Sequence, residues 1–151
     1  MTTRQRKSPV KKLNYSTLIQ APRQVVWDTM LAPDTYRQWT VGFCEGSYYE
    51  GSWEKGSGIK FLSPGGEGMR AVIAENREPD YLSIQHLACI LNGGEDLLPE
   101  PAYENYTFRD SGTGTELLVE VDIDEKWETM FEEMWPRSLG LLKGLCETKH
   151  P

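Results

Sequence analysis

His86 and Tyr106 are the two side chains of this sequence that could do acid–base chemistry in an apolar environment. Each lies in a segment of alternating apolar and polar residues, on the face that the alternation predicts to point inward. A histidine in an apolar cavity can act as a general base near neutral pH, and a tyrosine hydroxyl can stabilise a developing oxyanion. Such a pair would suit an aldol-type cyclisation or a hydrolysis. The alternative is that His86 is a core histidine bonded to a neighbour or to water.

Metal, disulfide and cofactor chemistry find little support in the sequence. The second histidine, His150, lies near the end of the chain, so no metal ligand set forms around His86. Cys44, Cys89 and Cys146 are far apart and odd in number, which argues against a disulfide framework or a zinc site. We predict all three to be small buried apolar groups, and we expect no metal and no cofactor.

The distribution of charge along the sequence limits the classes of molecule that the protein can bind. The net charge is -7, yet five of the 16 basic side chains lie in the first twelve residues: Arg4, Arg6, Lys7, Lys11 and Lys12. The remaining sequence is strongly acidic, so we expect no nucleic-acid partner. We predict residues 1–12 to be a flexible basic tail. No apolar run is long enough to cross a membrane, and no signal peptide is evident, which predicts a cytoplasmic protein.

The elements that would position these side chains begin with one strand and two short helices. Residues 13–20 alternate as a strand does, and Pro22 suits the first turn of a helix that runs to Leu31. Pro33 ends that helix and begins another, which reaches Trp39. We predict that these helices close one end of a curved sheet, with Trp27 and Trp39 as the plug.

The middle of the chain, from Phe43 to Ile123, has the spacing of an antiparallel meander. Glycine-rich segments such as EGSWEKGSG, SPGGEG, LNGGED and DSGTGT separate short alternating runs, which predicts hairpins rather than phosphate-binding loops. The clearest run, GTELLVEVDID, has one dry and one wet face. The inward residues that we predict are Ile59, Phe61, Leu82, Ile84, His86, Ala88, Ile90, Tyr106, Phe108, Thr115, Leu117, Val119, Val121 and Ile123.

After Ile123 the apolar residues recur at helical spacing to the end of the chain. Pro136 lies within this pattern, and its missing N–H predicts a kink or a broken first segment. This long helix is the one element able to cover the dry face of the sheet. The sequence therefore predicts an α+β fold in which a curved antiparallel sheet of six or seven strands wraps around a long C-terminal helix. Residues 13–148 form a single domain in this prediction.

Several motifs resemble a known family over nearly all of this domain. They are IQAPRQVVWD (Ile19 to Asp28), YRQW (Tyr36 to Trp39), WEKGS (Trp53 to Ser57) and the terminal pattern of Trp135, Leu139, Leu142, Lys143 and Glu147. They are similar to the START/polyketide-cyclase (SRPBCC) superfamily, in its branch of homologues of the heat-shock-protein-90 ATPase activator. The resemblance implies a helix-grip fold, as in birch-pollen allergen, with a cavity between sheet and terminal helix. Members bind lipids, hormones or other hydrophobic molecules, cyclise polyketides, or bind a chaperone.

Three functions stay open at this point. The first is binding of a small hydrophobic or amphipathic ligand, without catalysis. The second is a cyclase or hydrolase that uses His86 and Tyr106, and the third is a chaperone-interacting module. An edge strand could also pair two copies into a homodimer. The residues that we expect to line the cavity are Trp39, Phe61, Met69, His86, Ala88, Tyr106, Phe108, Met134, Ser138 and Leu142.

Overall fold

A computed structural model describes residues 10–149 of the chain. Most of the predicted basic tail lies outside the described residues, but positions 10–12 already belong to the first strand. The elements in chain order are β1 (Val10–Ile19), α1 (Arg23–Leu31), α2 (Pro33–Trp39), η1 (Thr40–Gly42), β2 (Tyr48–Gly51), β3 (Gly58–Leu62), β4 (Gly68–Arg77), β5 (Tyr81–Leu91), β6 (Gly94–Ser111), β7 (Gly114–Asp124), η2 (Glu125–Trp127) and α3 (Glu128–Lys149).

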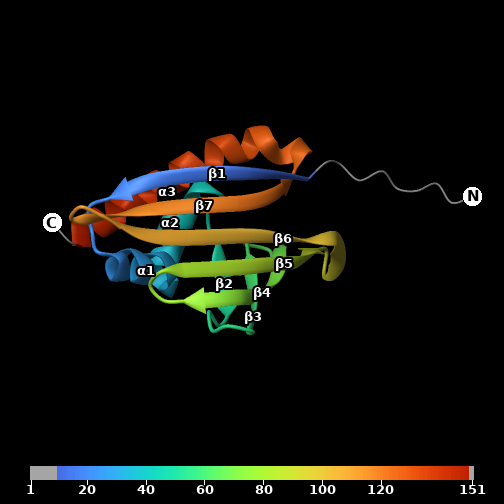
Figure 1. Cartoon of the computed structure of the whole chain (residues 1–151). Helices are drawn as coiled ribbons and strands as arrows, with labels where there is room; N and C mark the ends of the chain where they lie inside the picture. Colours follow the sequence, from blue (N-terminus) through green and yellow to red (C-terminus); the bar gives the residue numbers. More distant parts are fainter. Residues whose placement is uncertain (1–9, 150–151) are drawn as a thin grey trace, which may run out of the picture.

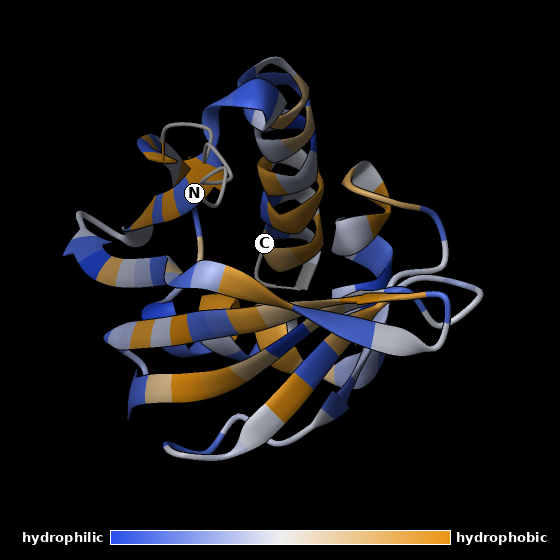
Figure 2. Ribbon diagram, turned by 90° about the vertical axis from the view of Figure 1, so that its right-hand side faces the viewer, coloured by the Kyte–Doolittle hydropathy of each residue, from blue (hydrophilic) through white to orange (hydrophobic). Residues whose placement is uncertain are grey.

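The strands form one seven-stranded antiparallel sheet in the order β1-β7-β6-β5-β4-β3-β2 (Figure 1). Consecutive strands from β2 to β7 are neighbours, and β1 returns to pair with β7 at the edge. The sheet is curved, and α3 lies on its concave side (Figure 2). The predicted helix-grip architecture, with two short helices after the first strand, is therefore confirmed.

Strand β7 shows why the sequence folds this way. Leu117, Val119, Val121 and Ile123 are all buried, and the residues between them are partly or fully exposed. A strand turns alternate side chains to opposite faces, so this pattern places an apolar row on the concave side. The same register continues across the sheet, because Val119 pairs with Tyr106 of β6.

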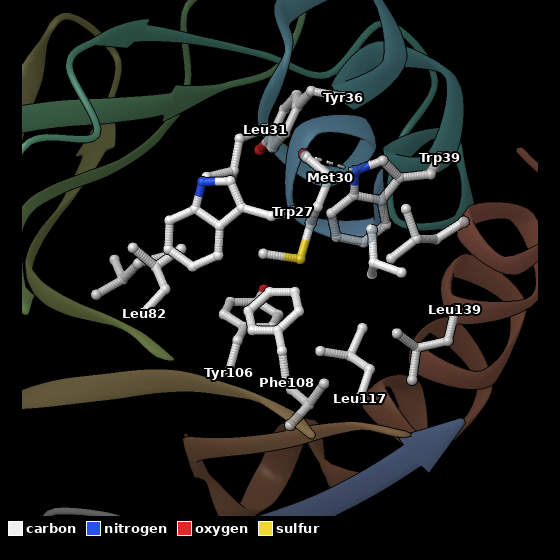
Figure 3. Packing of buried hydrophobic residues seen from close by; sticks show 14 of the residues in the cluster. Trp27, Met30, Leu31, Tyr36, Trp39, Leu82, Tyr106, Phe108, Leu117 and Leu139 are labelled. Atoms are coloured by element: carbon white, nitrogen blue, oxygen red, sulfur yellow. Dashed lines mark hydrogen bonds between the residues drawn. The ribbon is translucent and has the colours of Figure 1, made fainter. Parts of the chain in front are cut away.

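Helices α1 and α2 cover one end of the concave face, as predicted. The ring of Trp27 packs on Phe108 of β6, with 5.2 Å between the ring centroids. Trp39 donates its indole N–H to the carbonyl of Met30 at 3.0 Å, which fixes α2 against α1 (Figure 3). Both tryptophans are buried, so the end of the sheet beneath α1 is filled by side chains.

Helix α3 runs through Pro136 without a break, so the expectation of a broken first segment is wrong. Pro136 and the preceding Glu132 and Glu133 are exposed, and water can therefore satisfy the carbonyl that the proline leaves unbonded. Among residues 10–149, no helix combines the length and the apolar character that a membrane crossing requires.

The C-terminal end of α3 is tied to the end of β1 by two charged side chains. Lys143 Nζ donates to the carbonyl of Leu18 at 2.7 Å and to Glu147 Oε2 at 2.6 Å. Glu147 also accepts from the backbone N–H of Gln20 at 2.9 Å. The hydrogen bond from Lys143 is the main cause that lowers the pKa of Glu147. These contacts give Lys143 and Glu147 of the terminal motif a structural role.

Cysteine exposure differs from the prediction of three buried thiols. Cys146 is buried in α3, Cys89 is half-buried in β5, and Cys44 is exposed. Cys44 lies in the turn after η1, where its Sγ lies 3.5 Å from the neighbouring carbonyl oxygen of Glu45. The cysteine at position 44 is therefore not a core residue.

The neighbouring leucines at positions 117 and 118 of β7 test whether one face of this strand is buried and the other is not. Leu117→Ala should lower the free energy of unfolding by about 2–5 kcal/mol, because it leaves a cavity in a fully buried row. Leu118→Ala is the matched control on the opposite face and should cost less than about 1 kcal/mol. Urea denaturation followed by circular dichroism measures both values. Equal losses in the two variants would contradict the burial of one face only.

Candidate ligand-binding pocket

A pocket of about 650 Å³ lies between the sheet, α2 and the N-terminal half of α3. Strands β3 to β7 line it from the concave face, and α1 contributes Met30 and Leu31 at one end. The lining residues are Met30, Leu31, Tyr36, Trp39, Thr40, Phe43, Ser47, Trp53, Phe61, Leu62, Ser63, Glu67, Gly68, Met69, Leu82, Ile84, His86, Cys89, Leu91, Ala102, Tyr103, Glu104, Tyr106, Val121, Asp122, Trp127, Phe131 and Trp135. Most are apolar, which is typical of a site for a small organic molecule.

The helical wall of the pocket comes from residues four apart. Trp127, at the end of η2, and Phe131 and Trp135 of α3 all line it. Spacings of four residues place side chains on one face of a helix, one above the other. Trp127 is about half exposed, whereas Trp135 is buried. The wall therefore runs from the surface at Trp127 to the interior at Trp135.

A β-bulge in β5 decides which side chains of that strand reach the pocket. His86 pairs with Ala71 and Ala102, while Ala88 pairs with Arg70 and Leu97, so residue 87 is extra. A one-residue slip turns the following side chains to the opposite faces. Leu82, Ile84 and His86 line the pocket before the bulge, and Cys89 and Leu91 line it afterwards.

Aromatic rings of the lining form a closed circuit of contacts, which we call the aromatic circuit. Its ring-centroid distances are 5.7 Å for Trp53–Phe61, 5.6 Å for Phe61–His86, 6.2 Å for Tyr106–Trp135, 4.8 Å for Trp135–Phe43, 5.9 Å for Phe43–Trp39, 5.9 Å for Trp39–Tyr36 and 6.4 Å for Tyr36–Trp53. The carboxylate of Glu104 closes the gap between His86 and Tyr106. Every ring has an aromatic or hydrogen-bonded neighbour on both sides, which holds the walls in place.

Glu104 connects the two candidate catalytic side chains. Its Oε1 lies 2.8 Å from His86 Nε2, and its Oε2 accepts a hydrogen bond from the hydroxyl of Tyr106. Glu104 and Tyr106 stand two residues apart on β6, and His86 lies on the adjacent strand β5. Because a carboxylate only accepts hydrogen bonds when ionised, both neighbours act as donors to it.

The tyrosine at position 106 keeps its proton over the whole physiological range. Burial raises its pKa well above the ordinary value, and the negative charge of Glu104 and the hydrogen bond to it raise it further. The pKa of Tyr36 is raised as well, by burial first and then by Glu104 and Tyr49. Both hydroxyls are therefore neutral near pH 7, and that of Tyr106 donates to Glu104.

Five of the residues expected in the cavity line the pocket: Trp39, Phe61, Met69, His86 and Tyr106. The other five, Ala88, Phe108, Met134, Ser138 and Leu142, lie outside its lining, each for a local reason. Ala88 follows the bulge in β5. Phe108 is covered by Trp27 of α1, as Figure 3 shows.

The three expected residues on α3 lie outside the pocket lining because of their positions along and around the helix. Met134 lies one residue from Trp135 and so on a neighbouring face of the helix. Ser138 fills the contact with η1, where a Cβ on Gly42 would come within 2.2 Å of its Oγ. Leu142 lies beyond this contact and belongs to the closed core.

Several lining residues were missing from the sequence prediction. Glu104 has the same strand parity as Tyr106, and this parity could have placed it on the inner face. Tyr36 lies in the YRQW motif, but its burial depends on the position of α2. Trp53 lies in a loop between β2 and β3, where no periodicity gives its direction.

Some polar atoms of the pocket walls lack a partner. The indole Nε1 atoms of Trp53 and Trp135, and the Nδ1 of His86, are buried without a hydrogen bond to the described residues. Buried polar groups are rarely left unpaired in folded proteins. These three atoms are therefore unsatisfied hydrogen-bonding groups of residues that line the hollow. Within residues 10–149, no three side chains of the types that bind metals are grouped to hold an ion.

Comparison with known proteins gives a family and a fold. The family described as "Activator of Hsp90 ATPase homolog 1-like protein" matches residues 20–147. Protein MLL2253 from Mesorhizobium loti aligns with a TM-score of 0.73 at 16% identity, over 93% of this chain and 100% of that chain. ChR145 from Cytophaga hutchinsonii aligns with a TM-score of 0.72 at 24% identity, over 92% and 95%.

CalU16 from Micromonospora echinospora has a TM-score of 0.63 at 18% identity, over 89% of this chain and 73% of that chain. At such identities these structures share the fold and nothing more is carried over from them. No curated protein matches the chain.

Tyr106→Phe tests the hydrogen bond to Glu104. The variant leaves a half-buried carboxylate with one donor fewer, so the free energy of unfolding should fall by about 1–3 kcal/mol at pH 7. The raised pKa of Tyr106 stabilises the fold below about pH 10, and that stabilisation is lost as the pH rises further, since only the unfolded chain ionises easily. The loss of stability above pH 10 should therefore be smaller in Tyr106→Phe.

Tyr48→Phe is the control, because Tyr48 lies outside the pocket lining. Urea denaturation at pH 7 and between pH 9 and 11 gives the comparison. If both variants matched the parent protein at every pH, the Tyr106–Glu104 contact would have no energetic role.

Proposed function

The chain belongs to the family of Activator of Hsp90 ATPase homolog 1-like proteins, an SRPBCC-type family, and we propose that it binds a small hydrophobic or amphipathic molecule. The site is the pocket between the sheet, α2 and the N-terminal half of α3. A ligand would bury its apolar body against the aromatic circuit and direct its few polar atoms to His86, Glu104 and the two indole N–H groups.

The observation that carries this proposal is the combination of size and surface in one place. A volume of about 650 Å³ falls in the range of sites for small organic ligands. Ordinary protein cores are packed without such voids, and side chains fill them to crystal-like density. Here the rings of the lining pack against one another around a hollow that they leave unfilled. Removal of apolar ligand surface from water supplies the free energy of binding.

A second candidate is an enzyme of the cyclase or hydrolase type, and the contact between His86 and Glu104 favours it. When the carboxylate of Glu104 accepts a hydrogen bond from the Nε2–H group of His86, it fixes the tautomer of the ring. Nδ1 then carries the lone pair that could take a proton from a substrate. Nδ1 has no hydrogen-bond partner among the described residues, so no other group competes for its lone pair. Loss of turnover in His86→Gln with ligand affinity retained would separate catalysis from binding.

Ala102→Trp tests the pocket as a binding site. Ala102 lines the hollow from β6, and an indole at this position would occupy space that a ligand needs. The neutral fluorescent probe N-phenyl-1-naphthylamine should bind to the parent protein with a rise in fluorescence. The variant should bind it at least about tenfold more weakly.

Thr107→Trp introduces the same side chain on the outer face of the same strand and should leave probe affinity unchanged. Melting curves of both variants confirm that each remains folded. Saturating probe without any response from the parent protein would contradict the proposal, as would equal affinity in Ala102→Trp.

A further inference from the structure

We propose that the pocket selects an organic cation: a molecule with an apolar body and an ammonium group that lies beside Glu104. This inference rests on the proposed binding function and names the chemical class of the ligand. It follows from the charge of the walls, the hydrogen bonds of one carboxylate and the rings around it.

The described lining residues carry acidic groups and a single histidine, and none of them is a lysine or an arginine. Asp122 is already compensated, because Lys12 Nζ lies 2.9 Å from its Oδ1 and the backbone N–H of Tyr103 donates to its Oδ2. Glu67 lies in the exposed turn between β3 and β4, where water screens its charge. Glu104 is the carboxylate that remains inside the apolar walls.

The contacts of Glu104 stabilise its negative charge without cancelling it. Its two close neighbours are the neutral hydroxyl of Tyr106 and the imidazole of His86. Protonation of the imidazole would place an N–H donor on the buried Nδ1, which has no acceptor among the described residues. A buried donor without an acceptor is costly, so the geometry favours the tautomer that carries its hydrogen on Nε2 and donates it to Glu104.

The carboxylate retains room for one further partner. Each oxygen accepts one hydrogen bond in the structure, while a carboxylate has about four acceptor positions. The side chain of Glu104 is 22% exposed, so it can be approached from the hollow. A partly buried charge is stabilised strongly by an opposite charge at contact distance, and no lysine or arginine among residues 10–149 forms an ion pair with Glu104.

The aromatic circuit supplies the second half of a cation site. The face of an aromatic ring attracts a cation within about 6 Å, and enclosures of several rings are used to bind quaternary ammonium groups. His86 and Tyr106 join Glu104 directly to this circuit, and Phe61 and Trp135 are the next rings on either side. An anion in the same place would meet the carboxylate and the electron-rich ring faces, so it would be rejected.

Three ligands that share a ten-carbon chain test this selectivity: decyltrimethylammonium, 1-decanol and decanoate. Isothermal titration at pH 7.5, below micelle formation, should show the cation binding at least about tenfold more tightly than the alcohol, with decanoate weakest. In Glu104→Gln the preference for the cation over the alcohol should disappear, while binding of 1-decanol should persist.

Glu120→Gln is the matched control, because it removes the same charge from the exposed face of β7. This variant should keep the full preference, which separates a local contact from the general acidity of the protein. The comparison of head groups on the parent protein decides the matter even where Glu104→Gln fails to fold.

Equal affinity for the three compounds would overturn the selection of cations and leave an apolar binding pocket in place. A preference for decanoate would overturn it in the same way. Binding of none of the three to the parent protein would overturn the pocket as a ligand site, and the inference would fall with it.

Discussion

The width of the apolar face of the sheet sets the layout of this protein. Seven strands about 4.8 Å apart span about 29 Å, whereas one helix with its side chains is about 10–12 Å wide. Helix α3 therefore cannot cover the concave face alone. Helices α1 and α2 cover one further part, and the last part remains as the hollow beside α2. The pocket is thus a geometric consequence of one long helix on a broad curved sheet.

The two halves of α3 differ in chemistry, and this difference keeps the hollow open. Towards the C-terminus, Leu139, Leu142 and Cys146 pack into a closed core together with α1. Towards the N-terminus, the wall is built from Phe131 and Trp135, which are large and rigid. Neighbouring rings of the aromatic circuit lie 4.8–6.4 Å apart between centroids and lose favourable contacts if they turn inward, so the circuit resists collapse. A pocket made in this way exists before any ligand arrives, and binding need not reorder its walls.

Much of the fold could be predicted from the sequence, because it rests on local periodicity. The alternation of Leu117, Val119 and Val121 defines a sheet with one dry face, and the later helical spacing supplies its cover. The family motifs then fixed the architecture. The residues that line the pocket were harder to predict, because the shape of the pocket depends on contacts between segments that are distant in the sequence. An extra residue in β5 reverses the parity that placed Ala88 inward, and no pattern in the sequence marks that bulge. Phe108 was excluded by Trp27, 81 positions earlier in the chain.

Glu104 gives the two candidate functions a common physical requirement. An ionised carboxylate inside apolar walls is stable only with donors around it, and Tyr106 and His86 meet part of that need. Had its purpose been only to orient His86, one oxygen would have sufficed and the second would not need a buried tyrosine. The arrangement instead fixes both oxygens in space while their charge stays uncompensated. In our proposal, a positively charged group in the hollow would complete the site, and a base at His86 would act on the same bound molecule. Under the cation proposal, the carboxylate selects the ligand, and catalysis at His86 would act on the molecule selected in this way.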